Sequence, residues 1–245
     1  MRKIFPEMLE SLNRGLVFCI FAYWIFCFVL LPFAIPVIAY GSWDNLELVS
    51  WIEIIYYVIN GVVLIGILKH YLADAFLNVQ INTKGVMKTV AITCVLMVAW
   101  VGLLALAFGR LQAPEVVLDF FPVSEMGVAM TPGLLTRTRP VLGTICLTCL
   151  VPFTVTGLFY ATAFAPVCCN RGKLGYLVVA AVLLIPAIFD IVWRGDAGFV
   201  LLDYFLRLPV HLLACWSYQK TDTVWAPIFS LSAFNLLMSV ANLVF

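Results

Sequence analysis

Residues 203–242 read DYFLRLPVHLLACWSYQKTDTVWAPIFSLSAFNLLMSVAN, a run that is apolar enough for lipid yet contains charged and polar side chains. Asp203, Arg207 and His211 are spaced four residues apart, so a helix places all three on one face. Because a charge in hydrocarbon is costly, this face must point into protein or water. The run therefore predicts two membrane helices that enclose a polar interior.

The composition of the whole chain is that of a membrane protein. Of its 245 residues, 64% are hydrophobic and 11% are charged, whereas soluble domains have about 45–50% and about 25%. The formal net charge of +1 indicates no nucleic-acid partner. The eight cysteines lie within or at the ends of apolar runs, so we expect no disulfide framework, no metal site and no cofactor.

Apolar runs of roughly 20 residues recur along the chain and predict an all-α, polytopic membrane helix bundle. The seven predicted crossings are residues 15–40, 48–69, 87–108, 140–168, 174–194, 197–217 and 224–244. The less apolar segment 111–136 predicts a short interfacial helix followed by a loop. We expect one domain, 1–245, in which residues 1–139 form three spans plus this interfacial segment and residues 140–245 form a four-helix core.

The distribution of Lys and Arg predicts how the chain is oriented in the membrane. With the N-terminus inside, the cytoplasmic segments contain nine of these residues and the outer segments contain four. Every lysine lies on the inner side in this arrangement. The N-terminus is therefore expected in the cytoplasm and the C-terminus outside.

Polar and ionisable residues in the last four predicted spans form the candidate binding site. They are Thr156, Tyr160, Asp190, Arg194, Asp203, Arg207, His211 and Asn235. Each also has a structural interpretation: acid–base pairs join helices, and a lone buried histidine is more often hydrogen-bonded than catalytic. Ser and Asn side chains connect neighbouring membrane helices, and Thr side chains usually bond to their own helix.

Three short motifs in residues 152–240 indicate a resemblance to a known family. Residues 215–228, CWSYQKTDTVWAPI, resemble the pattern G-W-x-Y-x-R-T-G-S-x-W-x-P-I, and Asn235 follows at the expected spacing. Residues 152–161 align with P-x-x-E-E-x-x-F-R-G, and residues 186–190 lie where F-x-x-x-H occurs. These patterns are typical of the CPBP family, the CAAX-protease and bacteriocin-processing intramembrane proteins also called Abi proteins. The resemblance implies a membrane-embedded helical fold, CPBP-like in its last four helices, and a bacterial inner-membrane location.

The catalytic groups of that family are replaced in this chain. The resemblance implies a Glu pair and a His that activate water, with a second His and an Asn that stabilise the oxyanion. Val155 and Thr156 occupy the Glu positions, Asp190 the first His position and Leu231 the second, and only Asn235 is retained. Valine and threonine cannot activate water, and leucine cannot donate to an oxyanion.

Three functions remain open from the sequence. We expect a pseudoprotease that binds a membrane protein or a hydrophobic or lipidated peptide without cleaving it. The second is an active intramembrane endopeptidase with a substituted site, for which the candidate catalytic residues are Asp190, His211 and Asn235, or else Glu115 or Glu125. The third is a small transporter or channel subunit, in which the charged face of the 197–217 helix conducts protons or ions.

Overall fold

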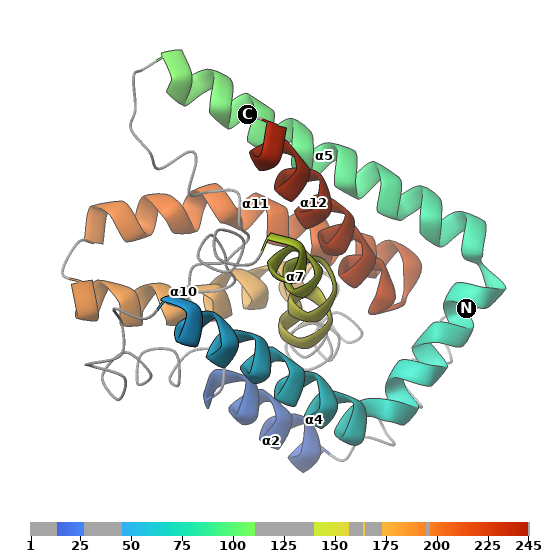
Figure 1. Ribbon diagram of the computed structural model, residues 1–245. Coiled ribbons are helices and arrows are strands. Elements are labelled where there is room, and N and C mark those ends of the chain that lie inside the picture. The colour runs from blue at the N-terminus through green and yellow to red at the C-terminus, as the bar shows by residue number, and fades with distance from the viewer. Residues whose placement is uncertain are drawn as a thin grey trace.

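The computed structural model describes residues 14–26, 46–110, 140–156, 164, 173–194 and 197–244. Within these ranges the chain forms helices joined by short turns and contains no strand (Figure 1). The helices are α2 (Arg14–Ile25), α4 (Leu46–Ile81), α5 (Thr83–Arg110), α7 (Pro140–Ile145), α10 (Leu174–Arg194), α11 (Ala197–Thr221) and α12 (Trp225–Val244), and two π-helical turns, η4 (Cys146–Leu150) and η5 (Pro152–Thr156), follow α7. The all-α expectation is confirmed for this part of the chain.

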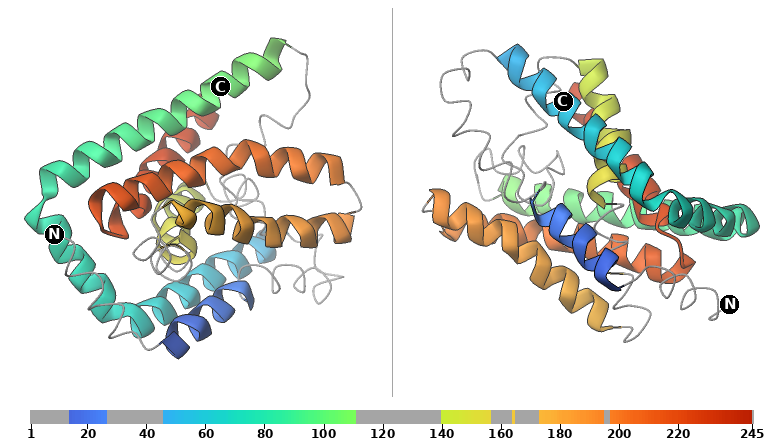
Figure 2. Two further views of the ribbon diagram at one scale, coloured as in Figure 1. Left: turned by 180° about the vertical axis from the view of Figure 1, so that it is seen from behind. Right: turned by 90° about the horizontal axis from the view of Figure 1, so that it is seen from below.

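The helices pack together as one bundle. Helices α10 and α11 lie side by side and antiparallel, and both α11 and α12 pack against α5 (Figures 1 and 2). The α7–η4–η5 segment lies between α12 and α4, while α2 runs along the outer side of α4. The helices named in the sequence interpretation as the four-helix core therefore pack on α5 and α4 as well as on one another.

The core is filled by large side chains that come from most of these helices. The largest fully buried ones are Tyr57, Leu64, Met97, Phe164, Tyr218 and Phe234. Phe164 is held edge-on between two tyrosines, with ring centroids 5.7 Å from Tyr176 of α10 and 5.4 Å from Tyr218 of α11. Such edge-to-face pairs contribute about 0.5–1.5 kcal/mol each beyond the area they bury.

Helix α4 is longer than the sequence predicts. The predicted crossing ended at residue 69 and was followed by a loop, whereas α4 runs on to Ile81 and α5 begins at Thr83, after the single residue Asn82. Residues 69–81 remain helical because one face of them is buried through Tyr71, Leu72, Ala75 and Val79, while Lys69 and Asp74 lie outside. The drop in hydropathy after residue 68 therefore marks a change in the surroundings of the helix rather than its end.

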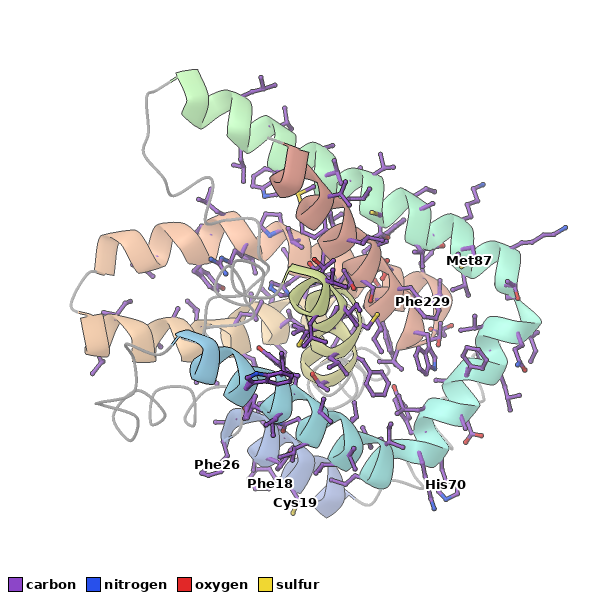
Figure 3. The ribbon with its side chains drawn as sticks, in the orientation of Figure 1. Phe18, Cys19, Phe26, His70, Met87 and Phe229 are labelled. Atoms are coloured by element: carbon purple, nitrogen blue, oxygen red, sulfur yellow. The ribbon has the colours of Figure 1, made fainter. Side chains whose placement is uncertain are left out.

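The outer surface of the bundle is apolar. Large apolar side chains are exposed on every long helix, for example Val62 on α4, Val95 on α5, Leu177 on α10, Phe205 on α11 and Leu237 on α12. Phe18, Cys19 and Phe26 project from α2 away from the other helices (Figure 3). Two described stretches, Ile54–Ile81 and Thr83–Leu104, are long and apolar enough to cross a membrane.

Gly61 of α4 lies against the η5 turn. A Cβ atom on Gly61 would lie 3.4 Å from Cγ2 of Thr154, whereas one on Gly66, further along α4, would meet nothing within 4 Å. Gly61→Leu is therefore expected to destabilise the fold by about 1–3 kcal/mol through overpacking. Gly66→Leu is the matched control and should change stability by no more than about 0.5 kcal/mol. Detergent-induced unfolding followed by circular dichroism measures both, and equal effects would contradict the close packing.

Candidate functional site

The polar interior of the bundle is formed by the inward faces of α11 and α12. His211 on α11 is 4% exposed and Asn235 on α12 is 5% exposed, and these two helices pack against each other. Arg207 lies one turn before His211 and is half-buried. His211 and Asn235 thus point into the protein, whereas Arg207 is partly exposed.

The backbone of α11 is tied to its neighbours in the turns around Arg207. Pro209 lies within the helix and cannot donate a backbone hydrogen bond, which loosens the helix at this point. The indole N–H of Trp100 on α5 donates to the carbonyl of Leu206 at 2.9 Å, and the hydroxyl of Tyr204 donates to the carbonyl of Ala180 on α10 at 2.7 Å. Side chains from α5 and α11 therefore fix this part of α11 in place.

Most buried hydroxyl groups bond to their own helix. Thr89, Thr93, Thr148, Thr154, Ser217 and Ser230 each donate to a carbonyl three or four residues earlier, at 2.7–2.9 Å. The expectation that threonines in these helices bond backward is confirmed at these threonines. Such hydroxyls contribute little to a binding site, which leaves the imidazole of His211 and the amide of Asn235 as the larger polar groups of the α11–α12 interior.

A buried asparagine that the sequence interpretation left out of the site lies on α4. Asn60 is 3% exposed, its Oδ1 accepts a hydrogen bond from the Tyr23 hydroxyl of α2 at 2.6 Å, and its Nδ2 donates to the Tyr56 carbonyl at 2.8 Å. It precedes Gly61, which contacts Thr154 in the η5 turn. The sequence does contain a signal for this role of Asn60, because it is an isolated amide in the middle of an apolar run. Such a group needs a hydrogen-bonding partner inside the bundle.

The turn between α11 and α12 has a structural role in this fold. Asp222 has a φ of 51°, the left-handed region that glycine adopts most easily, and it stands where the CPBP-like pattern has Gly. The Thr223 hydroxyl donates to the Ala75 carbonyl of α4 at 2.8 Å, and the Trp225 indole N–H donates to the Leu72 carbonyl at 3.0 Å. The turn is thereby fastened to the second half of α4.

Asp222→Gly is expected to stabilise the protein by about 0.5–1 kcal/mol, because glycine adopts the left-handed conformation without steric cost. Asp222→Val should destabilise it by about 1–2 kcal/mol for the opposite reason. Detergent-induced unfolding of the two variants and of the unchanged protein measures their relative stability. If valine were tolerated as well as glycine, the backbone conformation of this turn would be wrong.

The positions that resemble the CPBP catalytic motifs are partly described. Leu231, at the place of the second family His, is 2% exposed and packed in the core. The structure describes the backbone, but not the side chains, of Thr156 in η5, Asp190 and Arg194 in α10, and Asp203 in α11. Tyr160 and segment 111–136 lie outside the described residues.

The backbone positions of Asp190 on α10 and His211 on α11 lie at different heights along the two antiparallel helices. The hydroxyl of Tyr176, near the start of α10, donates to Oε1 of Gln219, near the end of α11, at 2.6 Å. Asp190 lies 14 residues from Tyr176, whereas His211 lies 8 residues from Gln219. At 1.5 Å per residue, this contact puts the two backbone positions roughly 9 Å out of level along the helix axes. The hydrogen bond from Tyr204 to the carbonyl of Ala180 corresponds to a still larger separation.

In the described part of the chain, no three His, Cys, Asp or Glu residues lie close enough together to hold a metal ion. The comparisons give no relative: no protein-family model, no curated protein and no solved structure matches this chain. The function must therefore be argued from the residues themselves.

Proposed function

We propose that the chain is an integral membrane protein in which seven helical segments cross the bilayer. The distribution of side chains supports this proposal, because large apolar side chains lie on the outer surface of the bundle as well as in its core. Asn60, Thr154, His211 and Asn235 are buried inside, while large apolar side chains cover the outside of the long helices. A soluble monomer rarely exposes continuous apolar patches of more than a few hundred square ångströms. In lipid the same surface is matched to its surroundings.

The proposed orientation has the N-terminus in the cytoplasm and the C-terminus outside, as in a bacterial inner membrane. The lysines that the structure describes support it, because all of them are exposed and lie on the second half of α4, at the start of α5, just before α10, or at the end of α11. Cytoplasmic segments of membrane proteins have an excess of Lys and Arg. The tight turn at Asn82 and the turn at Asp222 are then both cytoplasmic.

Within the membrane, we propose that the protein acts as a CPBP-like pseudoprotease, which binds a hydrophobic or lipidated peptide or a membrane-protein segment without cleaving it. The observation that supports this most directly is the pairing of a buried Asn235 with a buried Leu231 one turn earlier on α12. The side chain of Asn235 is an amide that can donate to a peptide carbonyl. Leu231, at the position of the histidine that would assist catalysis, is an alkyl side chain packed in the core.

The register of α10 and α11 also favours binding over cleavage. A general base must reach its water or its partner within about 2.6–3.2 Å, directly or through one water. This difference in height, roughly 9 Å or more along the helix axes, argues against a catalytic pair formed by Asp190 and His211. His211 then serves as a hydrogen-bonding group beside Arg207 rather than as a base.

The test uses the purified chain in lipid nanodiscs with a fluorescent farnesylated peptide that ends in a CAAX sequence. Fluorescence anisotropy measures binding, and mass spectrometry of the same sample measures cleavage. We expect saturable binding and an intact peptide. The double variant His211→Leu/Asn235→Leu should bind about 10-fold more weakly, since each lost hydrogen bond contributes about 0.5–1.5 kcal/mol.

The matched control is Leu236→Ala/Leu237→Ala on the exposed face of α12, which should bind like the unchanged protein. Cleavage that disappears in Asp190→Asn would contradict the proposal and establish the endopeptidase instead. Proton-dependent flux into liposomes without peptide binding would establish a transporter. Circular dichroism of each variant shows whether a loss of binding reflects a loss of fold.

A further inference from the structure

Exposed lysines lie at one end of the bundle, on the second half of α4, at the start of α5, just before α10 and at the end of α11. They are Lys69, Lys84, Lys88, Lys173 and Lys220, and they include every lysine whose side chain the structure describes. We call this surface the lysine end. The exposed acids described near it are Asp74 and Asp222, so positive charge is in excess.

Specific contacts bring these lysines together from four helices. The hydrogen bonds from Thr223 to Ala75 and from Trp225 to Leu72 hold the α11–α12 turn, and with it Lys220, against the second half of α4. The hydrogen bond between Tyr176 and Gln219 brings the beginning of α10, with Lys173, to the end of α11. Lys84 and Lys88 follow at once because α5 begins two residues after α4 ends.

The second half of α4 is suited to a membrane interface. Helix α4 has 36 residues and is about 54 Å long, although a hydrocarbon core needs only about 20 residues. Figure 1 shows that α4 changes direction part-way and then runs across this end of the bundle toward α5. Phe76, Leu77 and Ile81 are exposed on this half. In Figure 3, His70 projects outward from α4 and Met87 lies beyond the corner on α5.

We propose that the lysine end binds the headgroups of anionic phospholipids, while Phe76, Leu77 and Ile81 enter the boundary between headgroups and acyl chains. This inference rests on the membrane location in the proposed function and adds a ligand that the location alone does not require. Exposed apolar side chains beside ammonium groups are the pattern of helices that lie in an interface. Lysine binds phosphate as a point charge, and several lysines near an anionic leaflet act together.

Electron paramagnetic resonance of reconstituted protein tests the proposal with spin-labelled phosphatidylglycerol and spin-labelled phosphatidylcholine. The ratio of the two association constants reports the preference for the anionic lipid. We expect the unchanged protein to prefer phosphatidylglycerol by about 3-fold at low salt, and this preference should shrink in about 1 M salt. The variant Lys69→Gln/Lys84→Gln/Lys88→Gln should lower the ratio toward 1, because three of the five ammonium groups of the lysine end are removed.

The control variant is Arg110→Gln/Arg137→Gln/Arg139→Gln, which removes the same charge from segments that the sequence assigns to the other side of the membrane. It should keep the preference for phosphatidylglycerol. The proposal is overturned if the lysine variant keeps the full preference, or if both variants lose it equally. If the unchanged protein showed no preference for phosphatidylglycerol, the proposal would also be overturned, and an acidic protein would be the better partner for the lysines. A chain that fails to enter liposomes at all would instead overturn the membrane location itself.

Discussion

Trp225→Ala is expected to destabilise the protein by about 3–5 kcal/mol, the cost of truncating a large aromatic side chain in a packed site. The indole ring lies 5.5 Å from Phe76 of α4, 5.9 Å from Phe153 of η5 and 5.6 Å from Phe229 of α12, measured between ring centroids. Its N–H also donates to the Leu72 carbonyl. One side chain thus joins three elements that are far apart in the sequence.

Detergent-induced unfolding followed by far-ultraviolet circular dichroism measures this effect without depending on tryptophan fluorescence. Trp225→Phe keeps most of the ring packing and loses the hydrogen bond, so it should cost only about 1 kcal/mol. Phe18→Ala removes an aromatic side chain that is 71% exposed on α2 and serves as the control. If Trp225→Ala were as mild as this control, the α11–α12 turn would not be anchored on α4 as described.

Val62→Lys is expected to prevent stable insertion or to cost about 2.5–3.5 kcal/mol, the cost of lysine at the centre of a membrane helix. Val62 is 66% exposed and lies in the first half of α4, where residues 54–68 contain no charged side chain. The substitution is costly because the ammonium group of lysine loses its hydration in hydrocarbon. In a soluble protein the same change at an exposed position would alter stability by no more than about 0.5 kcal/mol.

Carbonate extraction of membranes and unfolding in nanodiscs measure the effect of Val62→Lys. Gln80→Lys adds the same charge to an exposed position of the same helix at the lysine end, and it should remain inserted and folded. If both lysine variants behaved like the unchanged protein, the apolar outer surface would not face lipid, and the proposed membrane location would be wrong.

The helical class and most helix limits could be predicted from the sequence because apolar run length and helix rise are local properties. The predicted spans 174–194 and 197–217 correspond closely to α10 and α11, which end at Arg194 and Thr221. The end of α4 could not be predicted in this way. Its last three turns are polar enough to suggest a loop, and they are helical because Tyr71 and Leu72 are buried beneath the α11–α12 turn.

The candidate site was predicted in part. The burial of His211 and Asn235 follows from helical spacing, because polar residues that recur on one face of an apolar helix must face the protein. Asn60 was not assigned to a site, since its partner Tyr23 lies on another helix 37 residues away. The sequence also could not show whether Asp190 and His211 lie at the same height. That depends on the register between α10 and α11, which residue spacing within one helix does not contain.

By itself, the sequence determined that the chain is helical and rich in apolar side chains, and which faces of its late helices contain polar residues. Only the tertiary structure decided that the residues of the α11–α12 motif fasten that turn to α4, and that lysines from four helices meet at one end. The physical reason is one of range. Hydropathy and spacing act within one helix, whereas hydrogen bonds such as that from Thr223 to Ala75 join residues that become neighbours only after the helices have packed.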